Sequence, residues 1–184
     1  MLQEILIKDG ELLIAIQDAL IDDRVTPIVT FITHLGDKGY LWIALGILLL
    51  FFKKTRRAGV LALVSLALTF LFVNLFLKDF VARTRPYEEL EAVRRLIEVQ
   101  HDYSFPSGHA ANSIAPAFAM FLNLPKKLGV PILLLAIAIA LSRLYVGVHY
   151  PLDVLGGIVI GGAMAFLVNT IANRIQDSRY PGKH

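Results

Sequence analysis

Charged residues are clustered along this chain, and long runs without any charge lie between the clusters. A helix that crosses a bilayer needs about 20 mainly apolar residues. The runs at 58–77 and 154–173 reach that length unaided. The other three runs reach it only with flanking polar residues that face a protein-lined cavity. The pattern predicts an all-α fold, a polytopic transmembrane bundle of five helices, with residues 25–35 as a sixth or re-entrant segment. The five uncharged runs cover residues 39–52, 58–77, 110–125, 128–142 and 154–173.

Two further segments have a different pattern. Residues 1–24 interleave leucine and isoleucine with acids, which predicts an amphipathic helix that lies at the membrane interface or packs on the bundle. Residues 78–108 form the longest polar stretch and are predicted to be an active-site loop. Within it, apolar residues recur at helical spacing over 87–100, which favours a short surface helix. The chain has no internal repeats, so residues 1–184 are expected to form a single membrane-embedded domain.

Composition supports a membrane protein and excludes other classes. The chain is 56% hydrophobic and 18% charged, whereas soluble domains average about 45–50% and 25%. Without cysteine it has no disulfide, thiolate metal site or cysteine nucleophile. The net charge of +3 does not indicate nucleic acid, because no basic tract is interleaved with aromatic residues. No basic segment precedes the first apolar residues, so we expect the first hydrophobic spans, rather than a signal peptide, to target the chain.

Basic loops give the orientation. If the five runs alternate across the membrane, three basic clusters fall on one face, and the first two contain no acid. The positive-inside rule places that face in the cytoplasm. The opposite face, with residues 78–108 and 143–153, is then predicted to be extracytoplasmic in a multi-pass protein of the cell membrane. The clusters are Lys53, Lys54, Arg56 and Arg57; Lys126 and Lys127; and Arg174, Arg179 and Lys183.

Three short polar segments lie at the edges of the uncharged runs. They are KDFVARTRP at 78–86, PSGH at 106–109 and SRLYVGVHYPLD at 142–153. Polar residues at such positions are expensive in a membrane protein and usually functional. With alternating spans, all three segments reach the same side of the membrane. We therefore expect their side chains to meet in one pocket.

The polar side chains of these segments suit a phosphate group. Lys78, Arg85 and Arg143 carry permanent positive charge, and guanidinium groups match phosphate oxygens bidentately. Gly108 allows close approach of the backbone to an anion at a helix start, and Ser107 adds a hydroxyl donor. No set of acids resembles a metal cage. The site is therefore predicted to bind phosphate without a metal or any other cofactor.

Two histidines suit two different roles. His149 and Asp153 are four residues apart, so a helical turn would place the carboxylate beside the ring, fix its tautomer and favour its positive charge. Pro151 suits the first turn of that helix. His109 is then available as the general acid that protonates the leaving oxygen. This arrangement favours a covalent phosphohistidine at His149 that water subsequently hydrolyses.

These segments, in this order, resemble the three signature segments of the type 2 phosphatidic acid phosphatase superfamily: Lys-x6-Arg-Pro, Pro-Ser-Gly-His and Ser-Arg-x5-His-x3-Asp. The resemblance covers about residues 28–173 and departs at no signature position. It implies a helical bundle with metal-independent phosphatase activity. It also implies that His149 is the nucleophile, Asp153 its orienting carboxylate and His109 the general acid. The residues that it implies for phosphate binding are Lys78, Arg85, Ser107, Gly108 and Arg143.

Other polar and small residues are expected to be structural. Predicted surface or interfacial groups are His34, His101, His184 and Arg83. Predicted to form hydrogen bonds between helices are Asn74, Asn112 and Asn169. Aromatic residues expected at the membrane interface are Tyr40, Trp42, Tyr145 and Tyr150. A close-packing face of the last span is predicted from Gly156, Gly157, Gly161 and Gly162.

Taken together, the sequence predicts a membrane enzyme that hydrolyses a lipid phosphate or pyrophosphate, whose tails remain in the bilayer. The preferred substrate is undecaprenyl pyrophosphate, by family analogy rather than by residue chemistry. Phosphatidylglycerol phosphate and phosphatidic acid are the alternatives. A noncatalytic lipid-phosphate binder or anion channel would also need basic residues, but it has no need of the two histidines. The sequence leaves the oligomeric state open.

Overall fold

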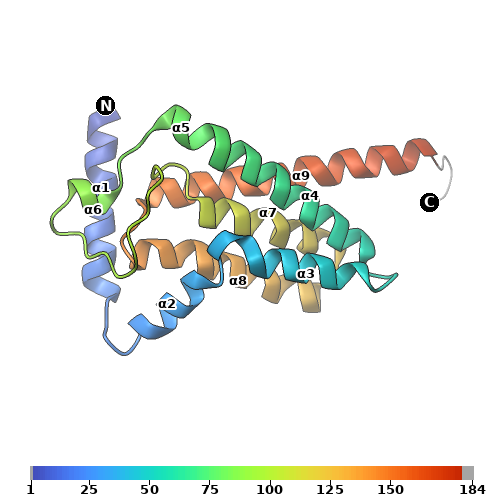
Figure 1. Ribbon diagram of the computed structural model, residues 1–184, viewed down its shortest axis with the longest axis horizontal. Coiled ribbons are helices and arrows are strands. Elements are labelled where there is room, and N and C mark those ends of the chain that lie inside the picture. Colours follow the sequence, from blue (N-terminus) through green and yellow to red (C-terminus); the bar gives the residue numbers. More distant parts are fainter. Residues whose placement is uncertain (1, 180–184) are drawn as a thin grey trace.

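The fold was obtained as a computed structural model, which describes residues 2–179 (Figure 1). All regular secondary structure within these residues is helical. The elements are α1 Leu2–Leu20, α2 Thr26–His34, the 3₁₀ turn η1 Asp37–Gly39, α3 Tyr40–Leu50, α4 Arg56–Phe72, the π-helical turn η2 Val73–Leu77, α5 Lys78–Val81, α6 Pro86–Glu89, α7 Gly108–Asn123, α8 Lys126–Tyr145 and α9 Pro151–Arg179.

Helix α7 forms the centre of the bundle and packs against α4, α8 and α9 (Figure 1). It is rich in alanine, and most of these alanines are fully buried. The predicted glycine face of α9 makes the close approach possible. A Cβ atom on Gly157 or Gly161 would lie 2.6 Å from a carbonyl oxygen of α7 or its N-cap, whereas Gly162 has no neighbour within 4 Å. The prediction of close packing is confirmed for Gly157 and Gly161.

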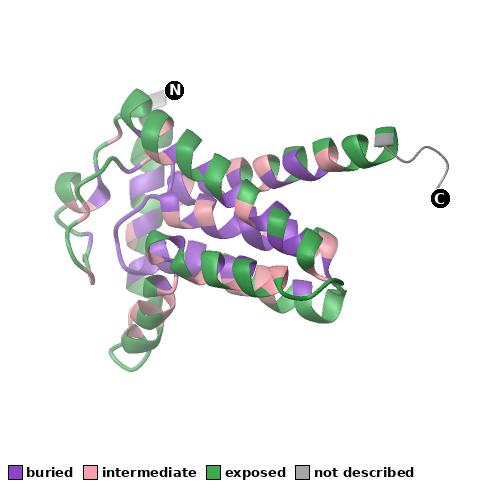
Figure 2. Cartoon of the chain, turned by 45° about the vertical axis from the view of Figure 1, so that its right-hand side comes forward, coloured by how far each residue is buried: buried purple, intermediate pink, exposed green. Residues whose placement is uncertain are grey.

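The helices of the bundle have exposed outer faces (Figure 2), and many of the residues exposed there are large and apolar. Large side chains such as Phe76, Leu134 and Phe166 are each about 60% exposed, which is typical of a surface in contact with lipid tails. Within residues 2–179, three helical stretches are long and apolar enough to cross a membrane, namely Arg56–Glu89, Lys126–Tyr145 and Pro151–Ser178. Helices α3 and α7, with 11 and 16 residues, are shorter. The chain is thus a multi-pass membrane protein with three recognisable spans, and α2, with nine residues, is too short to cross alone.

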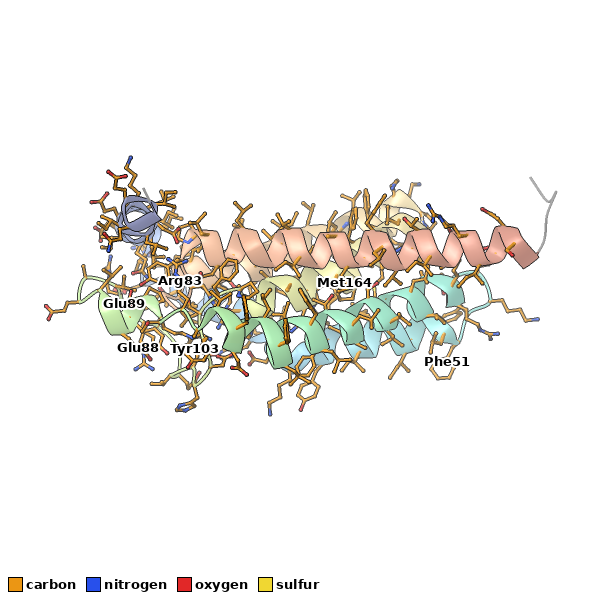
Figure 3. The ribbon with its side chains drawn as sticks, turned by 90° about the horizontal axis from the view of Figure 1, so that it is seen from above. Phe51, Arg83, Glu88, Glu89, Tyr103 and Met164 are labelled. Atoms are coloured by element: carbon orange, nitrogen blue, oxygen red, sulfur yellow. The ribbon has the colours of Figure 1, made fainter. Side chains whose placement is uncertain are left out.

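Helix α1 lies across one end of the bundle instead of along it. Figure 3 shows it end-on, at the end where Arg83 and Glu89 are labelled. Its Leu13 is fully buried, in a cluster with Val93 and Val154. This amphipathic segment thus packs on the bundle, and its position at the membrane interface stays a prediction.

The predicted surface helix over 87–100 is wrong beyond its first residues, since α6 ends at Glu89 and an irregular segment follows. The apolar residues at helical spacing instead pack against other parts of the chain. Val93 packs with α1, whereas Leu96 packs on Val146 and its amide donates to the carbonyl of that residue at 3.1 Å. Tertiary contacts therefore replace the hydrogen bonds that a helix would make within itself.

Three of the aromatic residues expected at the membrane interface are buried. Trp42 is fully buried and its indole donates to Ser113 Oγ at 3.0 Å. The Tyr150 hydroxyl donates to Glu89 at 2.8 Å, and the Tyr145 hydroxyl bonds to Thr26 Oγ1 at 2.9 Å. These rings fill the interior because each polar atom finds a partner there. Tyr40 is 64% exposed, in keeping with the prediction.

The two ends of the bundle differ in charge. The turn between α3 and α4, with Lys53 and Lys54, and the C-terminal end of α9 lie at the end opposite α1 and α6 (Figure 1). The three signature segments lie at the α1 end, as alternation of the spans requires.

Candidate active site

A cavity of about 600 Å³ opens at the α1 end of the bundle. One part of its wall is polar and includes Lys78, Arg85, His109 and His149. An apolar part of the wall comes from α3 and α4, with Ile43, Leu63, Leu66, Ala67 and Phe70. Residues from all three signature segments thus reach one cavity, which has a charged region and a lipid-like region.

Lys78 and Arg85 share one carboxylate, that of Asp102 in the irregular segment. The Lys78 ammonium and the Arg85 guanidinium each donate to a different oxygen of Asp102. Burial raises the pKa of Asp102, but the charges of Lys78 and then Arg85 outweigh it and lower that pKa to about 2. The two cations are 3% exposed, whereas the Asp102 side chain is 51% exposed. An accessible carboxylate therefore occupies the position where two buried cations converge.

Arg143 is buried near the end of α8, with 1% of its surface exposed. Its Nη1 donates to Thr33 Oγ1 of α2 at 2.7 Å. Its Nε and Nη2 have no hydrogen-bond partner. Buried donors without partners are rare because each one carries a desolvation penalty. The two unpaired donors of this guanidinium, Nε and Nη2, suit two oxygens of an oxyanion.

Ser107 and Gly108 form the start of α7. The Ser107 hydroxyl accepts from the Ala110 amide at 3.3 Å, so Ser107 is the N-cap of α7. Its own amide donates to the Asp153 carbonyl at 3.0 Å. Gly108 lines the cavity, and a Cβ there would lie 3.1 Å from Asn74. The glycine keeps the entrance to the helix start open.

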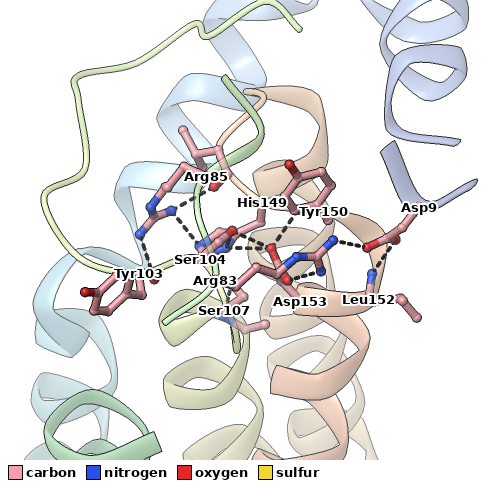
Figure 4. Close-up of polar contacts among 12 residues, drawn as sticks. Asp9, Arg83, Arg85, Tyr103, Ser104, Ser107, His149, Tyr150, Leu152 and Asp153 are labelled. Carbon is pink, nitrogen blue, oxygen red and sulfur yellow. Dashed lines mark hydrogen bonds and ion pairs between the residues drawn. The ribbon is translucent and has the colours of Figure 1, made fainter. Parts of the chain in front are cut away.

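The His149 ring is buried between Asp153 and Arg85 (Figure 4). Its Nδ1 lies 3.6 Å from Asp153 Oδ2, and its Nε2 lies 3.2 Å from Arg85 Nη1. A guanidinium only donates, so Nε2 carries the lone pair and the proton resides on Nδ1, facing the carboxylate. This tautomer leaves the lone pair of Nε2 on the cationic side of the ring.

The spacing predicts that Asp153 favours a positive charge on this ring, and Asp153 does lie beside the ring, but burial and the neighbouring cations act in the opposite direction. Burial, followed by the charges of Arg85 and Arg143, holds the pKa of His149 well below its usual 6.5. The single carboxylate is outweighed because the site gathers several cations around the ring. A neutral imidazole is the form that attacks phosphorus.

The acid limb of kcat/KM is therefore expected well below pH 6.5, since kcat/KM reports ionisations of the free enzyme. Lowering the pH from 7 to 6 leaves the His149 lone pair available. The measurement is phosphate release between pH 4.5 and 8, with the substrate's own ionisation determined by ³¹P NMR in the same detergent. An acid limb of kcat/KM that is centred at pH 6.5 and is not due to the substrate would contradict a depressed pKa of His149.

His109, on the first turn of α7, contacts a carboxylate that the sequence did not single out. Its Nε2 lies 2.9 Å from Asp37 Oδ1, and His34 Nδ1 lies 2.9 Å from the other oxygen of Asp37. The two oxygens of the Asp37 carboxylate thus each contact one imidazole ring, and the carboxylate lies beside the ring expected to act as general acid. His34 is 46% exposed and belongs to the same chain of contacts.

The expectation that Arg83 is a surface group is also wrong. Its side chain is 14% exposed and ion-paired with Asp153, from Nη1 to Oδ1 at 2.6 Å, and with Asp9 of α1. Asn74 and Asn112 make the predicted hydrogen bond between helices, at 2.9 Å, and both also line the cavity. His101 is exposed as expected, and His184 lies outside the described residues.

The additional residues have a common feature. Asp9, Asp37, Asp102 and Ser104 lie outside the three signature segments, and each reaches the site through a contact with a residue far away in the sequence. The one local signal is the clustering of Asp102 and Ser104 just before 106–109. Asp9 and Asp37 have no sequence signal of this kind.

A helical membrane bundle with a cationic cavity that continues into an apolar region defines a class, the membrane phosphatases that act on lipids. Residues 58–177 match the PAP2 superfamily. An undecaprenyl-diphosphatase of Sulfolobus acidocaldarius is 34% identical over 140 residues, 76% of this chain and 67% of that protein. Phosphatidylglycerophosphatase B of Bacillus subtilis is 34% identical over 165 residues, 83% and 77% of the two chains.

The fold is also that of a solved structure. The transmembrane PAP2 type phosphatidylglycerolphosphate phosphatase from Bacillus subtilis superposes with a TM-score of 0.72 and 27% identity, over 92% of this chain and 87% of the other. This chain belongs to the PAP2 superfamily and is a membrane lipid phosphatase of that type. The family resemblance of the signature segments is confirmed.

Proposed function

We propose that this protein removes the terminal phosphate of a lipid pyrophosphate, with undecaprenyl pyrophosphate as the preferred substrate, through a phosphohistidine at His149. The observation that carries the proposal is the single cavity where His149 and His109 face a cluster of buried cations beside an apolar wall. Such a cavity accepts a charged headgroup and the first part of a lipid tail together. The similarity to an undecaprenyl-diphosphatase supports the choice of substrate.

In the proposed reaction, Lys78, Arg85 and Arg143 surround the oxygens of the terminal phosphoryl group. His149 Nε2 attacks phosphorus in line, the bond to the bridging oxygen breaks, and His109 donates a proton to that oxygen. Water then attacks the phosphohistidine and gives its proton to His109, while the bond between phosphorus and Nε2 breaks. Inorganic phosphate leaves, and both rings return to their starting states.

The same proposal covers topology and location. We propose that α3 and α7 also cross the bilayer, α3 together with η1 and α7 within the shelter of its neighbours, which gives five spans in the cell membrane. The basic loops at the end opposite the cavity support an extracytoplasmic active site. The single-domain organisation of residues 1–184 is part of this proposal.

A second candidate substrate is phosphatidylglycerol phosphate, which the fold of the Bacillus subtilis phosphatase favours. Phosphatidic acid has the same kind of phosphomonoester. A noncatalytic binder or channel has no comparable support, because the relatives described above are phosphatases.

The deciding experiment is phosphate release by the purified full chain in detergent, with four lipids side by side: undecaprenyl pyrophosphate, phosphatidylglycerol phosphate, phosphatidic acid and diacylglycerol pyrophosphate. We expect the highest kcat/KM for undecaprenyl pyrophosphate. A kcat/KM at least about tenfold higher for a monoester, 1.4 kcal/mol in transition-state stabilisation, would favour the second candidate. Binding without release would refute a phosphatase.

Activity is expected to persist in excess EDTA. Lys78, Arg85 and Arg143 supply the positive charge that a metal ion supplies in other phosphoryl transfers. The measurement is the initial rate with and without EDTA, with a magnesium-dependent phosphatase in the same buffer as control. Loss of activity in EDTA and recovery on adding Mg²⁺ would contradict this prediction.

A further inference from the structure

The carboxylate of Asp153 is the end of a chain of polar contacts that begins on α1 (Figure 4). Its side chain is fully buried, and its Oδ2 accepts from the Ser104 hydroxyl and from the Tyr150 amide at 2.8 Å. Its Oδ1 accepts from Arg83 Nη1 at 2.6 Å. A buried carboxylate is tolerated only with a counter-charge and full hydrogen bonding. Arg83 supplies that charge.

The Arg83 guanidinium is fixed from two further sides. Its Nη2 donates to Asp9 Oδ2 at 2.8 Å, and its Cζ lies 3.8 Å from the centre of the Tyr150 ring. Ala82 has a positive φ of 49°, which turns the chain back after α5 toward the site. The planar fork of one arginine thus bridges two carboxylates, and a lysine cannot reproduce this geometry.

Asp9 links the same group to the start of α9. It is 4% exposed, and its Oδ1 accepts from the Leu152 amide at 2.9 Å. Amides of the first turn of a helix have no partner within the helix, and an anion there is favoured by the helix dipole. One carboxylate on α1 therefore holds both Arg83 and the helical turn that carries Asp153.

We infer that α1 is part of the catalytic apparatus: Asp9 and Arg83 are positioning residues that hold the Asp153 carboxylate oriented toward His149 Nδ1. The inference rests on the proposed function of His149 as nucleophile. Asp153 fixes the proton on Nδ1 only while its carboxylate stays in place, and the lone pair of Nε2 is then directed at phosphorus. Asp9 lies outside residues 58–177, the part of the chain that matches the family.

The test compares Asp9→Asn and Arg83→Gln with the wild type in phosphate release from undecaprenyl pyrophosphate by the full chain in detergent. We expect kcat to fall about tenfold for Asp9→Asn and about 100-fold for Arg83→Gln, since small displacements of a reacting group have effects of this size. KM stays within about twofold, because neither residue lines the cavity. Arg83→Lys, which keeps one ion pair, recovers part of the loss.

A double variant separates positioning from general loss of stability. If Asp9 acts through Asp153, Asp9→Asn lowers the activity of the wild type but not the residual activity of Asp153→Asn. Independent effects multiply, whereas effects along one pathway do not. Asp18→Asn is the matched control on the same helix, since its ion pair with Arg94 is exposed and such pairs contribute little; we expect its kcat within about twofold of wild type.

Three outcomes would overturn the inference: kcat unchanged in both Asp9→Asn and Arg83→Gln, the same fold-loss from Asp9→Asn in the Asp153→Asn background, or a loss confined to the yield of folded protein. In each, wild-type turnover shows that the proposed function stands while α1 has no catalytic part. A wild type inactive on all four lipids would refute the proposed function itself, and this inference with it.

Discussion

Replacing His149 with glutamine is expected to lower kcat about 10⁴-fold or more, because the step that forms the covalent intermediate is then lost. Glutamine has a similar volume and keeps a donor for Asp153, so the buried position stays filled. The cations remain, and substrate binding is expected to change much less than turnover. The measurement is phosphate release in detergent, together with binding of the lipid to the inactive variant.

The intermediate itself gives a second measurement. Substrate labelled with ³²P in the terminal phosphate is expected to label the wild type but not His149→Gln, provided that the reaction is stopped in alkali, where phosphohistidine survives. His101→Ala is the control, since that ring is exposed and does not line the cavity. Turnover by His149→Gln within tenfold of wild type would exclude His149 as nucleophile.

The parts of the fold that the sequence predicted are those that depend on local patterns. The uncharged runs at 58–77, 128–142 and 154–173 correspond to the three helical stretches long enough to cross a membrane. The runs at 39–52 and 110–125 form helices of 11 and 16 residues, because α3 ends at Leu50 and α7 ends at Asn123, each before its run is over. Run length alone cannot show where a backbone turn ends a helix.

The irregular segment after α6 shows how tertiary contacts override a periodic pattern. Leu90, Val93 and Leu96 have helical spacing, yet Leu90 and Val93 pack in a cluster with Leu13 of α1, whereas Leu96 packs in another cluster with Val146. The Arg94 amide donates to the side chain of Gln17 at 2.9 Å instead of to a carbonyl four residues earlier. That partner is on α1, 77 residues away, and periodicity contains no information about it.

The residues of the candidate site also fall into two groups, those that local sequence patterns identify and those that only tertiary contacts reveal. The signature segments identify the groups that line the cavity or lie beside it, because those groups are specified by chemistry at fixed spacing. Asp9 of α1 and Asp37 of η1 instead contact Arg83 and His109 from outside these segments. Arg83 lies within the first segment, but its pairing with Asp153 follows from no signature position. An isolated acid on an amphipathic helix is usually solvated, and only the fold shows that Asp9 is buried against an arginine.

Arg143→Met is expected to separate stability from activity. The buried guanidinium has two donor groups without partners, and an unpaired buried charge destabilises a fold. Methionine removes that charge at similar length, although the Thr33 hydroxyl loses a donor, which is a smaller effect. We therefore expect the variant without phosphate to unfold at the same temperature as wild type or above it.

Its turnover is expected to fall about 10³-fold, the size seen when an oriented donor to a developing charge is removed. The turnover of Arg143→Lys is expected to lie between that of wild type and that of Arg143→Met, since lysine replaces the two parallel donors of the guanidinium with a single point charge. Inorganic phosphate or vanadate should raise the unfolding temperature of wild type through binding to the native state, and this increase should disappear in Arg143→Met.

The control is Arg94→Met, because Arg94 is exposed, pairs with Asp18 and does not line the cavity. It is expected to keep wild-type turnover and the full stabilisation by phosphate. Near-normal turnover of Arg143→Met, or an undiminished response to phosphate, would show that the orphaned donors of Arg143 do not bind the phosphoryl group. A strongly destabilised Arg143→Met would show instead that the guanidinium is a structural group, which its missing partners argue against.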